Sequence, residues 1–564
     1  MMRRERGMSY EEIAEQLGIS KNKVKVQLVK ASKFLKEYFT AHTGISLLWC
    51  FPCCIRYDAN TAKQLFFQKL ILMMKNTFVA TVLLFLLFTT PSLAQDRDYL
   101  YYVQEHCNHL IGYGQDQVGT IHTHMLASVI DTRDMSVPKA GVPSTKGTRS
   151  QDRAVGGSNF YHDAETIKLF NALSKLTGDE KYQQAAHQYA RDFLTHAQNP
   201  HTGLLAWGEH LYYNFYADTV MVGDLEQPRG DIYHEFLAET PPWAFLWDID
   251  TAAVARAIAG VRYHFRSPIT QSFLFNRHAR WSKVDKKEYR GLAQYQDGGQ
   301  PWIKHSGLQC YSFTFLYDKT RNPEWKRWAE GTGSLYWKYR HPETSLTVSC
   351  IDDPRPNALY ASLNSMALLS YYLMKSGQLN PAFSHFKERA ETMLKAAEKF
   401  SWDEERKGYY SGLYLDGSVF NDELIPVVYT GYGGSDILAF GRIAAYFYKA
   451  TGDPAYRSMV KRVADMLSTT TWPEDFVINS LASALQFSLD AYEVLEDEHM
   501  LQTARQYAET GVQKLWSGKL FVREPGDPYY EAKLGTSGLV AGLFRLHLIE
   551  RDEMMKASLS HWSF

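Results

Sequence analysis

Apolar residues recur at helical spacing through most of the chain after residue 95. In the segment LTGDEKYQQAAHQYARDF they fall at i, i+4, i+7 and i+11, from Tyr182 to Phe193, and ATGDPAYRSMVKRVADML repeats this spacing from Tyr456 to Leu467. Such spacing is the buried stripe of an amphipathic helix. In both segments a Thr-Gly-Asp turn precedes the stripe, where glycine ends one helix and aspartate caps the next. The pattern predicts helical hairpins.

Weaker copies of the same unit extend the prediction along the chain. They are KTRNPEWKRW around Trp325 and LEDEHMLQTARQYAE around Met500, and a further full helix is predicted by the stripe Val254, Ile258, Val261 and Phe265. Hairpins repeated through residues 95–564 predict a mainly α fold, an α/α toroid or incomplete α/α barrel. A regular α-solenoid is the alternative, but its repeats would be more uniform in length.

The segments between the predicted helices differ in kind. Gly- and aromatic-rich strings such as GYGGSD and YYEAKLGTSG are typical of loops at one mouth of a toroid. Short β-like stretches around Tyr409–Tyr414 and Lys519–Arg523 predict β-hairpins within such loops. Residues 132–158 are polar and rich in Gly and Pro, and a loop of this length in a compact domain is usually functional or disordered.

The first 94 residues have a different character. In residues 7–39 two short apolar helical faces are separated by Gly18, and Ser20 can cap the second helix, which is a helix-turn-helix pattern. This segment resembles region 4 of an extracytoplasmic-function sigma factor, and we assign residues 1–45 to such a fragment. One interpretation of the chain is therefore a sigma-factor-like DNA-binding regulator that uses residues 7–39.

A second start follows this fragment. Met73-Met74-Lys75 precede the apolar run from Phe78 to Phe88 and then TTPSLAQ, which predicts a signal peptide over residues 73–94, cleaved after Ala94. The simplest account is an over-long reading frame, with residues 1–45 a spurious extension and residues 95–564 the mature domain. We expect a periplasmic or secreted protein with no stable membrane anchor, and no nucleic-acid partner for the mature protein.

Composition narrows the functional classes. The net charge of −1 gives no whole-chain field that would favour nucleic acid or a membrane. Aromatic residues make up 14% of the chain, and their flat rings suit carbohydrate surfaces as well as a helical core. The predicted mature part has only three cysteines, Cys107, Cys310 and Cys350, which make no disulfide framework.

Three residues far apart in the sequence suggest a metal site. His210 follows a Trp-Gly-Glu turn, Glu235 comes 25 residues later, and His278 lies in the string FNRHARW. Two imidazoles and one carboxylate leave open coordination positions and suit Mn, Fe, Co or Zn, whereas calcium prefers oxygen ligands. His234 precedes Glu235, and on a helix the two would point about 100° apart, so we expect only Glu235 to face the site.

The run HEFLAETPPWAFLWDIDTAAVARAIAGVRYHFRSPITQSFLFNRHARW resembles the family 2 polysaccharide lyases, the periplasmic pectate lyases. The likeness covers roughly residues 205–281. It implies an α/α toroid that cleaves polygalacturonate (pectate) or oligogalacturonides by β-elimination to 4,5-unsaturated products, with a divalent transition metal, most of all Mn. Carried over to this chain, it implies metal ligands His210, Glu235 and His278 and a catalytic Arg277. Beyond the range of the likeness, Lys283 and Lys304 are expected as substrate-binding auxiliaries.

Some features of the sequence leave alternatives open. The string WGEHLYYNFYADTV departs from the family pattern, so Glu209 competes with His210 as a ligand. Arginine is an awkward base because a guanidinium pKa normally exceeds about 12, and it can instead clamp a substrate carboxylate. A glycoside hydrolase or a sugar epimerase on the same toroid is the rival, and a hydrolase needs two carboxylates. Its candidates are Asp248, Asp250, Asp352, Asp353, Glu474 and Asp475.

Overall fold

The computed structural model describes six stretches of the chain: residues 98–222, 233–265, 273–281, 301–351, 360–431 and 435–553. The chain divides into two units, Met1–Gln95 and Asp96–Phe564, and the described residues all belong to the second. The predicted helix-turn-helix (1–45), the predicted signal peptide (73–94) and Lys283 lie outside the described residues. No helix within the described stretches is long and apolar enough to cross a bilayer.

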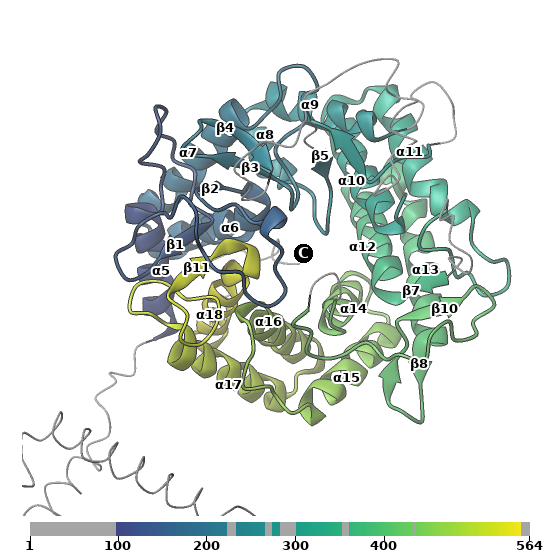
Figure 1. Cartoon of the computed structure of the whole chain (residues 1–564). Coiled ribbons are helices and arrows are strands. Elements are labelled where there is room, and N and C mark those ends of the chain that lie inside the picture. Colours follow the sequence, from purple (N-terminus) through teal and green to yellow (C-terminus); the bar gives the residue numbers. More distant parts are fainter. Residues whose placement is uncertain are drawn as a thin grey trace, which may run out of the picture. The chain divides into compact units, whose positions relative to one another are not determined.

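Helical hairpins follow one another around a ring in the second unit (Figure 1). The inner helices pack each on the next in the order α10, α12, α14, α16, α18 and α6, and the outer helices α7, α11, α13, α15 and α17 each pack on the preceding inner helix. The mainly α toroid expected from the sequence is therefore confirmed. The helices are α5 (Tyr99–Tyr113), α6 (Phe160–Thr177), α7 (Glu180–His196), α8 (Trp243–Ile249), α9 (Thr251–Gly260), α10 (Ile303–Thr320), α11 (Pro323–Lys338), α12 (Leu363–Leu379), α13 (His385–Ser401), α14 (Leu438–Thr451), α15 (Pro454–Thr469), α16 (Ile478–Leu495), α17 (Glu498–Leu515) and α18 (Thr536–Glu550).

The Thr-Gly-Asp turns join hairpins in the way the sequence predicts. Gly178 and Gly452 end helices α6 and α14 in the left-handed conformation, with φ of 73° and 72°. Asp179 and Asp453 then cap α7 and α15 by accepting hydrogen bonds from backbone N–H groups of the first turn. Every stripe residue of both helices is at most 2% exposed: Tyr182, Ala186, Tyr189, Phe193, Tyr456, Val460, Val463 and Leu467. Burial of these stripes holds each outer helix on the inner ring.

One predicted helix is shorter than expected. The stripe from Val254 to Phe265 is buried, but α9 ends at Gly260 and a 3₁₀ turn, Val261–His264, completes it. Gly260 lies against a neighbouring loop, because a Cβ there would be 2.5 Å from the carbonyl oxygen of Thr202. The close approach explains both the glycine and the change of helix type, which brings His264 to the back of the strand pair described below.

Short antiparallel strands lie in the loops of the ring. They are β1 (Val129–Asp131), β2 (Gly157–Ser158), β3 (Leu211–Asn214), β4 (Thr219–Val222), β5 (Tyr233–Glu235), β6 (His278–Arg280), β7 (Tyr360–Ser362), β8 (Trp402–Asp403), β9 (Gly408–Tyr409), β10 (Gly412–Tyr414) and β11 (Tyr529–Glu531). They form the sheet β2-β3-β4 and the pairs β1-β11, β5-β6, β7-β10 and β8-β9.

Short hairpins form in both predicted regions. Strands β8 and β9 form a hairpin that ends at Tyr409, and the antiparallel bridges Tyr410–Leu424 and Leu413–Val419 fold the next residues back on themselves. Around residues 519–523 an antiparallel bridge joins Trp516 and Phe521. The pairing of β10 with β7, a strand some fifty residues earlier, was not predicted, because local alternation of residues does not specify a distant partner.

Buried ion pairs join the first loops of the unit to its last hairpin. Arg153 donates to both oxygens of Glu531 at 2.7 and 2.9 Å, and Arg523 donates to Glu531 and Asp527 at 2.7 and 2.9 Å. Arg153, Arg523 and Glu531 are at most 1% exposed, so these charges are stable there only because they are paired. Together with the β1-β11 pair, this network closes the ring and fixes the short 3₁₀ turn Ala532–Leu534.

Candidate active site

The strand pair β5-β6 positions two of the three predicted ligands. Glu235 and His278 are directly opposite each other in its register. The sequence argument treated His234 and Glu235 as neighbours on a helix, and this was wrong, because they lie on a strand. Successive side chains of a strand point to opposite faces. Glu235 therefore faces the ring's interior site, while His234 turns away and its Nδ1 lies 2.8 Å from Nε2 of His264.

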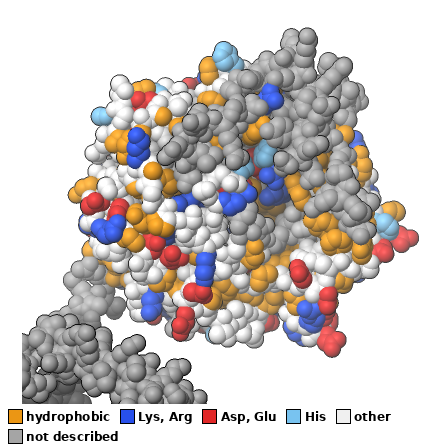
Figure 2. Space-filling model, viewed as in Figure 1, with side chains coloured by type: hydrophobic (Ala, Val, Ile, Leu, Met, Phe, Trp, Pro, Cys, Tyr) orange, Lys and Arg blue, Asp and Glu red, His pale blue; other side chains and the backbone are white. Residues whose placement is uncertain are grey.

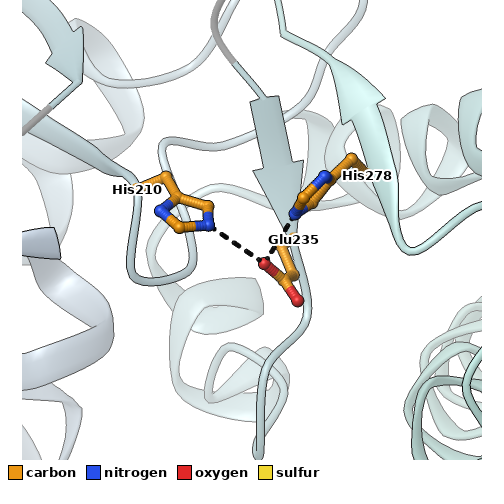
Figure 3. Close-up of side chains that lie close together, drawn as sticks. All are labelled: His210, Glu235 and His278. Atoms are coloured by element: carbon orange, nitrogen blue, oxygen red, sulfur yellow. Dashed lines mark hydrogen bonds and ion pairs between the residues drawn. The ribbon is translucent and has the colours of Figure 1, made fainter. Parts of the chain in front are cut away.

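His210, Glu235 and His278 come together at one point (Figure 3). Oε2 of Glu235 lies 2.9 Å from Nε2 of His278 and 3.6 Å from Nε2 of His210. Glu235 is 1% exposed, whereas the two histidine side chains are partly open to solvent. The carboxylate is thus the buried member of the group, and the two imidazoles lie nearer the solvent.

A third histidine, which the sequence reasoning missed, approaches the same carboxylate. His305 on α10 is 1% exposed, and its Nε2 lies 3.5 Å from Oε1 of Glu235. This contact is longer than a good hydrogen bond, and neither ring nitrogen has another hydrogen-bond partner among the described residues. Burial lowers the pKa of His305 to about 4, against the opposing effect of Glu235, so the ring is neutral near pH 7. The only feature of the sequence that pointed to His305 was its position beside Lys304. The spacing along the chain does not relate His305 to Glu235.

The contacts of His278 suit a cation better than they suit a hydrogen bond. Nε2 of His278 accepts a hydrogen bond from Nε of Arg277 at 3.1 Å, and the same nitrogen lies 2.9 Å from the Glu235 carboxylate. An imidazole nitrogen that accepts has no proton to donate, so one nitrogen cannot serve both neighbours. A metal ion between nitrogen and carboxylate would satisfy both lone pairs.

Donor spacing and charge state agree with this fit. Ligand atoms about 2.0–2.2 Å from a common ion lie within roughly 4.4 Å of one another, and the distances from Oε2 of Glu235 to the two imidazole nitrogens, 2.9 and 3.6 Å, fall within that limit. Burial alone would raise the pKa of Glu235, but contacts with His278 and His305 and the charge of Arg277 hold it well below its ordinary value. The carboxylate is therefore ionised, as a ligand must be.

The loop 132–158 orients the remaining histidine. Its 3₁₀ turn Ser150–Asp152 places the fully buried Asp152 so that Oδ1 accepts from Nδ1 of His210 at 3.0 Å. Arg149 holds Asp152 with two hydrogen bonds of 2.7 and 3.0 Å. Burial raises the pKa of Asp152, yet His210 and Arg149 together bring it below its ordinary value. The ionised Asp152 keeps the proton of His210 on Nδ1 and directs the Nε2 lone pair towards Glu235.

A second group of potential ligands shares His210 but differs in its counter-charges. Asp152, Glu209 and His210 also bring ligand atoms within 4.8 Å of one another. Glu209, however, is 3.6 Å from the guanidinium of Arg149 and 3.5 Å from the ammonium of Lys533. Glu209 thus faces two permanent cations, whereas Glu235 faces one, Arg277 at 3.6 Å, and has the imidazoles of His278 and His210 as further ligands. The group around Glu235 is therefore the better candidate for a metal ion.

Of the three other predicted site residues, the structure describes Arg277 and Lys304. Arg277 precedes β6, is 29% exposed, and its Nε lies 3.6 Å from Oε1 of Glu235. Lys304 lies in the first turn of α10, within the electrostatic influence of Glu235 and Arg277. Burial lowers its pKa, and Glu235 opposes that shift while Arg277 adds to it. The structure thus brings Arg277 and Lys304 to the candidate site, and Lys283 lies outside the described residues.

The carboxylates considered for a hydrolase have other roles where they are described. Asp250 caps α9 by accepting from Ala253 N at 2.8 Å, and Asp475 pairs with Lys146 at the surface. Asp248 and Glu474 are exposed, and Asp352 and Asp353 lie outside the described residues. A surface cleft of about 540 Å³ adjoins Asp250, but Asp250 is the single carboxylate among its lining residues.

The fold and the site together define an α/α toroid with a candidate His/Glu metal centre. Residues 145–359 match the model of the family described as periplasmic pectate lyase, a range that contains the His210–Glu235–His278 group, Arg277 and Lys304. Residues 1–35 match the family described as sigma-70, region 4. Both resemblances drawn from the sequence are therefore confirmed.

Solved structures with a similar course of the chain include three sugar-active proteins. An α-mannanase of glycoside hydrolase family 76 from Bacteroides thetaiotaomicron has 12% identity and a TM-score of 0.42, with 81% of this chain and 98% of that chain covered. A D-mannose isomerase has 10% identity and a TM-score of 0.45, with 81% and 99% covered. A cellobiose 2-epimerase from Bacillus thermoamylovorans has 12% identity and a TM-score of 0.42, with 80% and 98% covered. Identities this low transfer no activity to this chain.

Proposed function

We propose that the chain is a metal-dependent polysaccharide lyase that cleaves polygalacturonate by β-elimination to 4,5-unsaturated products. The supporting observation is the buried Glu235 between His210 and His278, with Arg277 beside it, all within the range that matches the pectate lyase family. An ionised carboxylate facing two imidazoles is a donor set for Mn, and also for Co, Fe or Zn.

The metal ion would supply positive charge to the substrate. When bound by His210, Glu235 and His278, a divalent ion adds positive charge beside the carboxylate of a galacturonate unit, which makes the neighbouring C5 proton easier to remove. Asp152 and His305 support the ligands from behind: Asp152 fixes the tautomer of His210, and His305 lies against the other oxygen of Glu235.

Arg277 acts on the substrate. It removes the C5 proton, or it clamps the uronate carboxylate while another base removes that proton. Either way the C5–H bond breaks, the C4–C5 double bond forms, and the glycosidic oxygen leaves C4 with its electron pair and takes up a proton. The guanidinium must first give up its hydrogen bond to Nε2 of His278. That nitrogen could not accept the bond while its lone pair was bound to a metal ion. Lys304 and Lys283 are proposed to bind substrate.

The charge around the site supports an acidic partner. Arg149, Arg277, Lys304 and Lys533 are four cations around three carboxylates, Asp152, Glu209 and Glu235, although the whole chain has a net charge of −1. Figure 2 shows Lys, Arg and His side chains gathered at the hollow in the centre of the ring face. A local excess of positive charge attracts polyanionic chains such as polygalacturonate or its oligomers.

We also propose that the enzyme acts in the periplasm or outside the cell. The support is the predicted signal peptide over residues 73–94 and the description of the matching family as periplasmic. Residues 1–45, with their sigma-factor likeness, would then be absent from the mature enzyme. N-terminal sequencing of exported protein should give Gln95 as the first residue, and finding residues 7–39 on it would favour the DNA-binding interpretation.

One digestion tests the central proposal. Purified protein is incubated with polygalacturonate, with and without a chelator, and the ultraviolet absorbance of conjugated unsaturated uronides is followed together with reducing ends. A lyase gives both signals, and the chelator removes both. A hydrolase would give reducing ends without the absorbance, and an epimerase would give neither while changing the sugar composition.

A further inference from the structure

Lys533 belongs to the last hairpin of the chain, yet it lies at the candidate site. It is in the 3₁₀ turn Ala532–Leu534, directly after β11, and its side chain is 11% exposed. The β1-β11 pair and the buried Arg153–Glu531 ion pair hold this turn in place. Lys533 is far outside the residues 145–359 that match the lyase family, so the family assigns it no role.

Glu209 links Lys533 to the candidate metal group. One oxygen of Glu209 lies 3.6 Å from Nε2 of His210, and the other lies 3.5 Å from Nζ of Lys533. The ammonium is therefore about one carboxylate group away from the place where an ion would bind. Because Glu209 contacts both groups, we expect one uronate chain to reach both positions.

The ammonium of Lys533 has hydrogen-bonding capacity to spare. An ammonium offers three donors, and its hydrogen bonds to carboxylates are about 2.7–2.9 Å long. At 3.5 Å the Glu209 contact is an ion pair without a hydrogen bond, and it is the one ion pair of Lys533 among the described residues. A mostly buried ammonium without acceptors is costly unless a ligand or water supplies them.

A neighbouring side chain has the same property. His162 on α6 is 8% exposed, and both of its ring nitrogens are buried without a hydrogen-bond partner. Burial holds the pKa of His162 well below its usual value, and the charge of Lys533 adds to this effect, which places the two groups near each other. Two adjacent polar groups with unused hydrogen-bonding atoms indicate a position prepared for a polar ligand rather than a closed structural ion pair.

We infer that Lys533 binds the carboxylate of a second uronate unit, next to the unit whose carboxylate lies at the His210–Glu235–His278 group. Arg149, which is 36% exposed and 3.6 Å from Glu209, borders the same position. The inference rests on the proposed lyase function and extends it: substrate recognition would require carboxylates on two neighbouring sugars. A chain esterified at every second unit would then be a poor substrate.

The test compares Lys533→Gln with Lys514→Gln as a matched control. Lys514 is exposed on α17, so its replacement removes the same charge at a distance from the site. Glutamine at position 533 removes the charge, is one bond shorter than lysine and keeps an N–H donor. We expect the KM of Lys533→Gln for polygalacturonate to rise about tenfold or more, the size of a lost hydrogen bond to a charged group. The control should match the wild type.

Two further measurements separate a binding role from a structural one. The Mn affinity of Lys533→Gln should stay within about threefold of the wild type, and Lys533→Arg, which keeps the charge, should retain most of the substrate affinity. A KM equal to that of Lys514→Gln would overturn the inference while leaving the lyase function intact. So would a fall in Mn affinity as large as the fall in substrate affinity, because Lys533 would then act through Glu209. If the wild type neither binds trigalacturonate nor cleaves the polymer, the lyase proposal itself fails.

Discussion

Two polar clusters of the ring share His210 and differ in what faces their carboxylates. Around Glu235 the neighbours are three imidazoles, those of His210, His278 and His305, at 2.9–3.6 Å, and one fixed cation, Arg277, at 3.6 Å. Around Glu209 the neighbours are the fixed cations of Arg149 and Lys533 at 3.5–3.6 Å. Both clusters have enough ligand atoms for an ion. This difference indicates that the charge of the groups facing each carboxylate, and not the number of carboxylates, decides which cluster would bind a metal ion.

Electrostatic repulsion between like charges favours a metal ion at Glu235 over one at Glu209. Two like unit charges 4 Å apart repel each other by about 4 kcal/mol at the effective dielectric constant typical near a protein surface. A divalent ion beside Glu209 would meet this repulsion from Lys533 and again from Arg149. Beside Glu235 it would meet the fixed charge of Arg277, but there the imidazoles of His210 and His278 offer lone pairs to it. On the proposed function, the first cluster is therefore suited to a metal ion and the second to an anionic substrate.

The largest effects should follow from changing the first cluster. Glu235→Gln and His278→Ala each remove a ligand, so we expect the purified protein to lose most of its metal and to fall below about 1% of wild-type β-elimination. Elemental analysis and the absorbance assay measure the two quantities. His201→Ala, at an exposed position, is the matched control. Full metal content in His278→Ala would show that the ion binds elsewhere.

A large but more selective loss is expected for Arg277→Lys. Lysine keeps the charge but lacks the planar fork and the reach of the guanidinium, so kcat should fall by about a hundredfold or more while KM changes less. Metal content should stay normal, because Arg277 is not a ligand. Arg256→Lys, on α9 beside the separate surface cleft, is the control and should be active. Unchanged turnover of Arg277→Lys would remove the residue from the mechanism.

Much of the ring could be predicted from the sequence because its signals are local. A Gly-Asp turn followed by a stripe such as Tyr182 to Phe193 specifies a helix end, a cap and a buried face within one segment of chain. The family-like string likewise identified Glu235 and His278. Neither signal needs knowledge of where distant segments lie.

The parts that could not be predicted depend on distant pairings. Strands β5 and β6 have three residues each, too few for alternation to be visible, so the strand that turns His234 away was taken for a helix. Asp152, His305 and Lys533 reach the site only because the ring closes. No spacing in the sequence links Lys533 to residues more than three hundred positions earlier, and the β1-β11 pair that places it is short as well.

A moderate effect is expected for Asp152→Ala. The mutation removes the acceptor that holds the proton of His210 on Nδ1, so the ligand tautomer and the ring orientation are no longer fixed. Loss of such a supporting carboxylate typically weakens metal binding about 10–100-fold. Titration with Mn should show this, and Asp152→Asn, which keeps an acceptor, should fall between it and the wild type. Asp475→Ala, at a side chain that is 75% exposed, is the control. Unaltered Mn affinity in Asp152→Ala would mean that His210 is not a ligand.

The smallest effect, and the sharpest test of the comparison, is expected for Glu209→Gln. If the second cluster serves the substrate, Glu209 gives the metal no bond, and Mn affinity should stay within about threefold of the wild type. Glutamine preserves the shape of the side chain and removes one negative charge beside Lys533, so KM for polygalacturonate should stay level or fall, because less anionic competition faces the incoming carboxylate. The same substitution at Glu235 should abolish metal binding, although both carboxylates lie 3.6 Å from Nε2 of His210. Equal loss of Mn in Glu209→Gln and Glu235→Gln would place the ion between the two clusters, with Glu209 as a ligand. The distinction drawn from their counter-charges would then be wrong.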